Sequence, residues 1–117
     1  MSVADLLDEL VQANPGCRMA AYADVGVGLV FLARGQGIPS REALDALCAK
    51  AALHLPPAED GSGATTVIDA SGLTVFLRSG EAPDEALCLR CDPEANLATL
   101  LPNGAVCLRR IAEEGAT

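Results

Sequence analysis

The sequence predicts an α+β fold with the order helix, two strands, helix, three strands, helix. Three segments repeat apolar residues at helical spacing, and five short apolar or β-branched runs are bounded by turn-forming residues. The first two runs are apolar at nearly every residue, which is typical of strands covered on both faces. We therefore expect a sheet buried on both sides. A length of 117 residues predicts a single domain, residues 1–117.

The first helix is expected to begin at Ser2 and to end before Asn14-Pro15-Gly16. Ser2 and Asp5 have the spacing of a capping box, in which each side chain accepts a hydrogen bond from the other residue's backbone. One apolar stripe follows, formed by Val3, Leu6, Leu7, Leu10 and Val11. The helix is therefore amphipathic and should lie on another layer of the fold.

Five strands are expected between the helices, two after the first helix and three after the middle helix. Residues 17–24 and 28–34 predict a hairpin, because both runs are apolar and Gly26 lies in the turn between them. Residues 65–68, 73–78 and 85–91 predict three more strands, of which the first is β-branched throughout.

The middle helix is expected from its N-cap, Ser40, to about Leu55. One side of this helix gathers Leu44, Leu47, Cys48, Ala51 and Leu55. Nearly opposite them lie Ala46, Ala49 and Leu53. Two apolar faces indicate a helix buried on two sides, although alanine on an exposed face also reflects helix propensity alone. The sequence leaves both interpretations open.

The last helix is expected to be capped by Asp92, with Pro93 at its first position. Pro102-Asn103-Gly104 falls inside this helix, and an interior proline costs about 3 kcal/mol. We therefore expect a kink, a break or a different C-terminal element, including a hairpin that turns at Asn103-Gly104.

Charge and hydropathy exclude several classes of partner. Sixteen acidic and eight basic residues give a net charge of −8, which disfavours ordinary nucleic-acid binding and adhesion to anionic lipid. The longest apolar stretch, residues 25–33, is too short to span a membrane, and the first helix lacks the basic start of a signal peptide. A cytoplasmic location without membrane insertion is the expectation.

Residues that carry chemistry are few. Cys88 and Cys91 have the C-x-x-C spacing, but residues three apart on a strand point to opposite faces, so packing in the core is expected for both. A zinc site needs further ligands, and His54 is the only histidine. The glycine pairs at 26/28 and 35/37 lack the rest of a phosphate-binding signature. We expect no enzymatic activity, no catalytic residues, no cofactor and no metal.

Four segments carry a family resemblance over Leu6 to about Leu101. They are the first helix running into Asn14-Pro15-Gly16-Cys17, the apolar hairpin, the alanine- and leucine-rich middle helix, and a last block in which a strand precedes Ala95-Asn96-Leu97. In this order they resemble the roadblock/LC7 family, of the type that regulates small GTPases in bacteria. Members generally have an uninterrupted final helix, so Pro102 is a departure from the pattern.

The resemblance implies a profilin-like, three-layer α/β/α sandwich with a five-stranded antiparallel sheet. It also implies a non-catalytic homodimeric regulatory or adaptor module whose partner is a Ras-like small GTPase or similar signalling protein. In the family the middle helices pack together and the third strands, which lie at the sheet edge, pair across the two-fold axis. The dimer interface would then contain Ala46, Ala49, Leu53, Thr65, Thr66, Val67 and Ile68. The alternative is a small-ligand-sensing domain of related architecture, which would need a pocket with inward polar groups.

Overall fold

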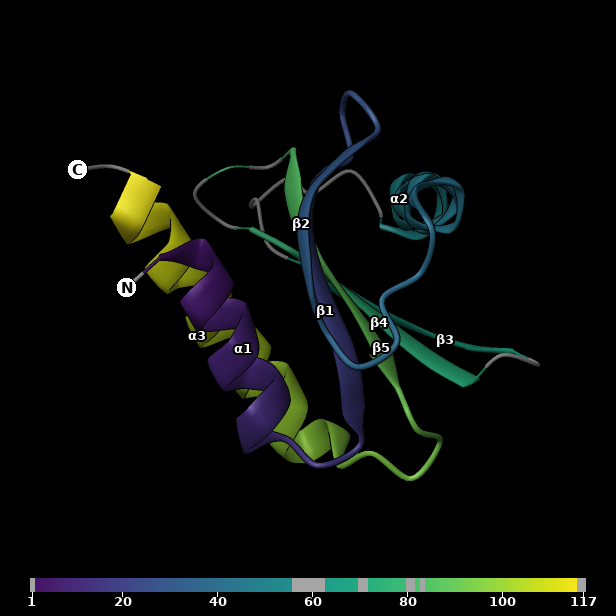
Figure 1. The fold of residues 1–117 in the computed structure, drawn as a ribbon, viewed down its shortest axis with the longest axis vertical. Coiled ribbons are helices and arrows are strands. Elements are labelled where there is room, and N and C mark those ends of the chain that lie inside the picture. The colour runs from purple at the N-terminus through teal and green to yellow at the C-terminus, as the bar shows by residue number, and fades with distance from the viewer. Residues whose placement is uncertain (1, 56–62, 70–71, 80–81, 83, 116–117) are drawn as a thin grey trace.

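The computed structural model describes residues 2–55, 63–69, 72–79, 82 and 84–115 (Figure 1). Its elements follow the predicted order, so the α+β prediction is confirmed. The elements are α1 (Val3–Ala13), β1 (Cys17–Asp24), β2 (Leu29–Gly35), α2 (Arg41–His54), β3 (Gly63–Asp69), β4 (Gly72–Arg78), β5 (Glu85–Cys91) and α3 (Leu97–Gly115).

The five strands form one antiparallel sheet in the order β2-β1-β5-β4-β3. Helices α1 and α3 cover one face of this sheet and α2 covers the other (Figure 1). The three-layer arrangement implied by the family resemblance is therefore confirmed. β5 is the central strand, whereas β2 and β3 are the two edges.

The sheet separates two hydrophobic clusters. On the central strand, Leu87 and Leu89 pack toward α1 and α3, while Ala86 and Cys88 pack toward α2. This alternation follows from the period of two along a strand. β1 and β5 are buried on both faces, as their continuous apolar sequences predict.

The same prediction is wrong for β2. Leu29 is 42% exposed and Phe31 is 48% exposed, because β2 is an edge strand that the helices cover only in part. Phe31 packs against Tyr22 of β1 with 5.4 Å between the ring centroids and a tilt of 45° between the rings. The pairing of β1 with β2 shifts between Tyr22 and Ala23. An apolar run therefore did not distinguish a covered strand from this edge.

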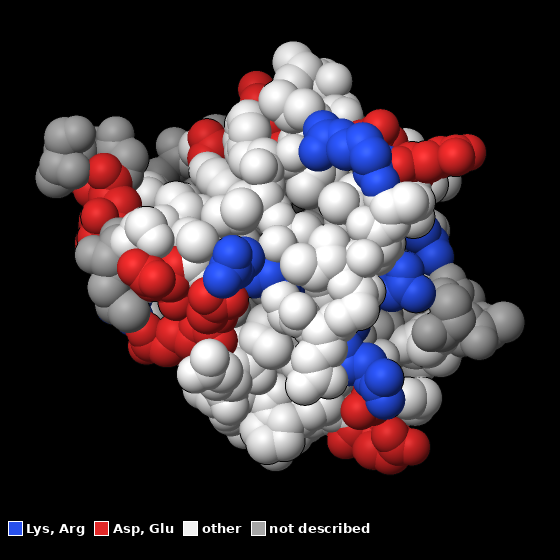
Figure 2. Space-filling model, in the orientation of Figure 1, with Lys and Arg blue, Asp and Glu red and all other residues white. Residues whose placement is uncertain are grey.

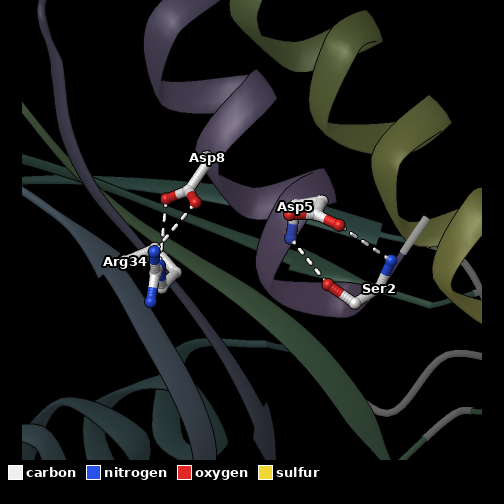
Figure 3. Close-up of polar contacts among 4 residues, drawn as sticks. All are labelled: Ser2, Asp5, Asp8 and Arg34. Carbon is white, nitrogen blue, oxygen red and sulfur yellow. Dashed lines mark hydrogen bonds and ion pairs between the residues drawn. The ribbon is translucent and has the colours of Figure 1, made fainter.

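Local polar contacts explain where the first two helices begin, and Figure 3 shows those of the first. The Ser2 hydroxyl accepts a hydrogen bond from the Asp5 N–H, and the Asp5 carboxylate accepts one from the Ser2 N–H, both at 3.2 Å. The predicted capping box is thus confirmed, and these bonds lower the pKa of Asp5. Ser40 caps α2 by accepting from the Ala43 N–H at 3.2 Å.

α1 is held to the sheet and to α3 by side-chain contacts. The Arg34 guanidinium of β2 donates twice to Asp8 of α1, at 3.0 and 2.9 Å (Figure 3). α1 and α3 run antiparallel to each other, and Arg110 donates to Glu9 at 3.2 Å (Figure 1).

A buried amide closes the C-terminal end of α1. Asn14 donates from Nδ2 to the Leu10 carbonyl at 2.8 Å and accepts from Asn103 Nδ2 of α3 at 3.0 Å. Sequence reasoning identified Asn14 only as part of a helix stop and missed this link between the two helices.

The last helix begins later than predicted. Asp92 and Pro93 lie in a turn, closed by a 3.0 Å bond from the Ala95 N–H to the Asp92 carbonyl, and α3 begins at Leu97. The expected cap at Asp92 is wrong, because its carboxylate binds Arg18. Ala95-Asn96-Leu97 does open the helix, as the family resemblance predicted, and the Asn96 carbonyl accepts from the Leu100 N–H at 2.9 Å.

α3 continues through Pro102 to Gly115, so the expected break and the hairpin at Asn103-Gly104 are wrong. The physical reason is tertiary packing. Each large apolar side chain buried from α3 contributes about 1.5–3 kcal/mol, which together offset the cost of the proline. The large residues that provide this burial are Leu100, Leu108 and Ile111, and the smaller Cys107 is buried beside them. Among the described residues, no helix is long and apolar enough to cross a membrane.

Candidate functional site

The outward face of α2 is open. Leu44, Leu47 and Cys48 are buried against the sheet, whereas Ala46 and Ala49 are exposed. Leu53 completes this outward face, and 80% of its surface is exposed. Within one chain, the second apolar face that the sequence indicated therefore has nothing packed on it among the described residues. Helix propensity favours both alanine and leucine, so the composition of this face by itself does not require a covering partner.

β3 is an open edge of the sheet, as predicted. Thr65 and Val67 are half-buried, and Val67 packs against the cluster under α2. Thr66 and Ile68 point to the other face of the sheet, where Ile68 is 77% exposed. The four residues thus share the strand edge but not one face. β3 contains no proline or lysine to protect that edge.

The helix face and the strand edge are joined at one corner. The Thr65 hydroxyl donates to the carbonyl of His54, the last residue of α2, at 3.2 Å. The Arg78 guanidinium of β4 donates to the Leu55 carbonyl at 3.3 Å, so two side chains bind the C-terminal end of α2. His54 also stacks on Phe76, with 6.3 Å between the ring centroids. The last turn of α2, which contains Leu53, therefore lies close to β3. We call Ala46, Ala49, Leu53 and the outer edge of β3 the helix–edge surface.

Charge is distributed unevenly over the molecule. Figure 2 shows acidic side chains gathered over α1 and α3 on the left of the view, whereas most visible basic side chains lie on its right half. On α2 itself, Arg41 pairs with Asp45 at 3.4 Å beside the alanine face. The side chains that form the helix–edge surface on α2 carry no charge.

The cysteines are placed as the sequence predicted. Cys88 belongs to the cluster under α2 and Cys91 to the cluster under α1 and α3, so their side chains diverge. Burial raises the pKa of Cys88 to about 12. Both thiols are therefore packed in the core.

Sequence reasoning missed a neighbour of Cys91. Cys17 is its cross-strand partner on β1, and both side chains lie in the same cluster. A hydrogen bond with Cys91 lowers the pKa of Cys17 and raises that of Cys91. The separation of 74 residues along the chain gave no signal of this pairing. Among the described residues, no three His, Cys, Asp or Glu side chains are grouped in a way that could hold a metal ion.

Comparison with known proteins identifies the fold. No protein-family model matches the chain, and no curated protein matches its sequence. Among solved structures, the Roadblock/LC7 domain from Streptomyces avermitilis is similar with a TM-score of 0.79 and 19% identity, and the match covers 100% of both chains. MglC from Myxococcus xanthus is similar with a TM-score of 0.72 and 18% identity, covering 97% of this chain and 99% of MglC.

The gliding protein MglB from Thermus thermophilus is also similar, with a TM-score of 0.68 and 22% identity over 96% of this chain and 89% of MglB. The similarity in each case extends over the helices and the sheet, since nearly the whole chain is covered. Together with the strand order and the placement of the helices, these similarities establish that this chain has the roadblock/LC7 fold.

Proposed function

We propose that this protein is a non-catalytic dimeric regulatory or adaptor module of the bacterial cytoplasm, which recruits or regulates a Ras-like small GTPase or a similar signalling protein. The observation that carries the proposal is the helix–edge surface. An exposed leucine on an alanine-rich helix, beside an unprotected strand edge, is suited to bind a second copy of the chain.

A second copy of the chain related by a two-fold axis would cover both parts of this surface at once. Two β3 strands related by such an axis pair antiparallel, which joins two five-stranded sheets into one. The same axis brings the outward faces of the two α2 helices together, where Ala46 and Ala49 permit close approach and Leu53 contributes most of the apolar area. The proposed interface residues are Ala46, Ala49, Leu53, Thr65, Thr66, Val67 and Ile68.

The proposed partner rests on two lines of support. The sequence resembles roadblock/LC7 proteins, and that resemblance implies partners among small GTPases. Solved structures with the same fold include MglC and the gliding protein MglB. A dimer presents two copies of every remaining surface, including the acidic faces of α1 and α3 (Figure 2), which are available to a partner.

The dimer is tested by replacing Ala49 with arginine. A charge at the centre of the α2 seam would be buried without a partner, so A49R should be monomeric while wild type is dimeric. Light scattering at micromolar concentration should give twice 12.0 kDa for wild type and 12.0 kDa for A49R. The matched control is A105R, which makes the same change at an exposed alanine of α3 and should remain dimeric. A monomeric wild-type protein, or a dimeric A49R, would refute the proposed interface.

The partner is tested separately. Tagged wild type and A49R serve as bait in native cells, and mass spectrometry identifies the proteins that each retains. A small GTPase retained repeatedly by wild type would support the proposal, and direct binding of that purified GTPase in its GTP- and GDP-bound forms would then be measured. Repeated failure to retain any nucleotide-binding protein would refute the GTPase assignment and leave the dimer intact.

A further inference from the structure

A cavity of about 640 Å³ lies at the end of the sheet where β1 and β4 begin and β5 ends. Its walls come from these strand ends, from the β2–α2 loop and from the first turn of α2. Its polar lining includes Arg18, Gln36, Arg90 and Asp92, and its apolar lining includes Met19 and Pro39. This volume falls in the range of about 300–1,000 Å³ that is typical of small-molecule sites.

Arg90 occupies an unusual position in the fold. It lies on the central strand, opposite Met19 of β1 and Thr74 of β4, both of which are buried. Because Ala86 and Cys88 face α2, the period of two places Arg90 on that same covered face. Arg90 is half-buried, yet no described carboxylate forms an ion pair with its guanidinium. Charged side chains in such positions are usually paired, so this guanidinium is available to a ligand.

A second guanidinium lies beside the same cavity. Arg18 donates from Nε to the Asp92 carboxylate, which partly neutralises its charge and holds its side chain in place. Two arginines and one aspartate still give this cavity a positive balance in a chain whose net charge is −8. Pro39 and Ala43 flank Ser40, the N-cap of α2, so the positive end of the helix dipole lies at the cavity wall.

We propose that this cavity binds a small molecule that carries a phosphate or carboxylate group. Arg90 is the main anchor for the oxyanion, because a guanidinium donates two parallel hydrogen bonds to either group. Arg18 and Gln36 contribute further donors, while Met19 and Pro39 contact the apolar part of the molecule. The overall acidity that disfavours binding to a polyanion does not prevent this binding, since the charges nearest the ligand dominate over those beyond about 8–10 Å.

The residues that line the site differ from those of the proposed dimer interface. The cavity contacts the first turn of α2 through Ala43, whereas Leu53 and the bond from Thr65 lie at the last turn. Binding of a small anion and self-association can therefore succeed or fail separately.

The test is a titration of ¹⁵N-labelled full-length chain followed by amide chemical shifts. Inorganic phosphate and malonate are the two probes, each at an ionic strength matched with sodium chloride. Saturable shifts are expected at the amides of Arg18, Gln36, Gly37, Arg90 and Cys91. Phosphate alone, malonate alone or both shifting these signals distinguishes the kinds of oxyanion that the site accepts. If neither phosphate nor malonate shifts these signals beyond the shifts that sodium chloride produces, the proposal is overturned.

Substitution then assigns the anchor. R90Q should weaken binding of the effective probe about tenfold, because it removes a charge-assisted contact while keeping a polar side chain. The control is R109Q, which makes the same change in charge at an exposed residue of α3 and should bind as wild type does. Equal affinities in R90Q and R109Q would overturn the role of Arg90. The spectrum of R90Q without probe shows directly whether the variant is folded.

Discussion

Replacing Gly104 with alanine adds one methyl group at a point where α3 lies close to the sheet. A Cβ atom at this position would lie under 3.0 Å from Leu77 Cδ1, and at 3.7 and 3.8 Å from the terminal methyl groups of Leu87 and Leu89. Glycine inside a helix normally lowers stability. Its presence here is explained by the close approach of α3 to β4 and β5, which leaves too little space for a Cβ atom.

Two opposing effects determine the stability of G104A. Alanine gains about 1 kcal/mol over glycine in a helix interior. Overpacking a filled core costs about 1–3 kcal/mol, and Leu77 has little room to move because it is only 5% exposed. The overlap should therefore outweigh the gain in propensity. We expect G104A to lower the free energy of unfolding by about 1 kcal/mol.

A double-mutant cycle with L77A separates the two effects. L77A alone should cost about 2–5 kcal/mol, since it removes a buried leucine. In the L77A background the overlap is gone, so G104A should now stabilise the protein by about 1 kcal/mol. The coupling free energy between the two positions is then about 2 kcal/mol.

Urea unfolding followed by far-UV circular dichroism measures this cycle, because the chain has one tyrosine and no tryptophan. All four proteins are compared at one concentration, since self-association would link stability to concentration. A stabilised G104A in the wild-type background, with effects additive to those of L77A, would refute the reasoning. Glycine at this position would then not be required by the close approach of α3.

Two further substitution and titration experiments follow from the buried polar groups. Burial raises the pKa of Cys88 to about 12 and that of Cys107 to about 11 from the ordinary 9.0. Above pH 9 the unfolded chain therefore loses these protons before the folded chain does. The contribution of the two thiols to the free energy of unfolding is complete below pH 9 and is lost as the pH rises toward 11–12. The titration of Cys88 alone should lower the free energy of unfolding by about 1 kcal/mol at pH 10. Urea unfolding of a C88A/C107A double variant should show a flatter pH dependence, and equal slopes would contradict the burial of both thiols. N14A should cost about 1–3 kcal/mol in urea unfolding because it leaves the Leu10 carbonyl unpaired, and N103A should cost less because Asn103 is half-buried; equal costs would contradict this difference.

The elements with strong local signals could be predicted from the sequence. Ser2 and Ser40 begin helices in the structure because a hydroxyl at an N-cap binds a backbone N–H three residues later. The strands were found from their apolar and β-branched runs, and the outer position of β3 came from the family resemblance. These features depend on a few neighbouring residues or on a pattern that extends over the chain.

The features that could not be predicted depend on contacts between distant segments. Asp92 and Pro93 form a turn before α3, which begins at Leu97, and the Asp92 carboxylate binds Arg18, which is 74 residues away in the sequence. The same helix continues through Pro102 because the burial of its apolar side chains offsets the cost of the proline. Local propensity contains no information about that packing. Arg90 was read only as one residue of an apolar strand. Its place in a cavity became visible once β1, β4 and the β2–α2 loop had been assembled around it.

The antiparallel packing of α1 and α3 has a practical consequence for attaching reporters. The beginning of α1 and the end of α3 lie at the same end of the molecule, on the face of the sheet that α2 does not occupy (Figure 1). A fluorescent protein fused before α1 or after α3 would therefore be tethered across the sheet from the outward face of α2. Donor and acceptor fusions at either terminus leave that face uncovered, so energy transfer between them can report on encounters of two chains in living cells.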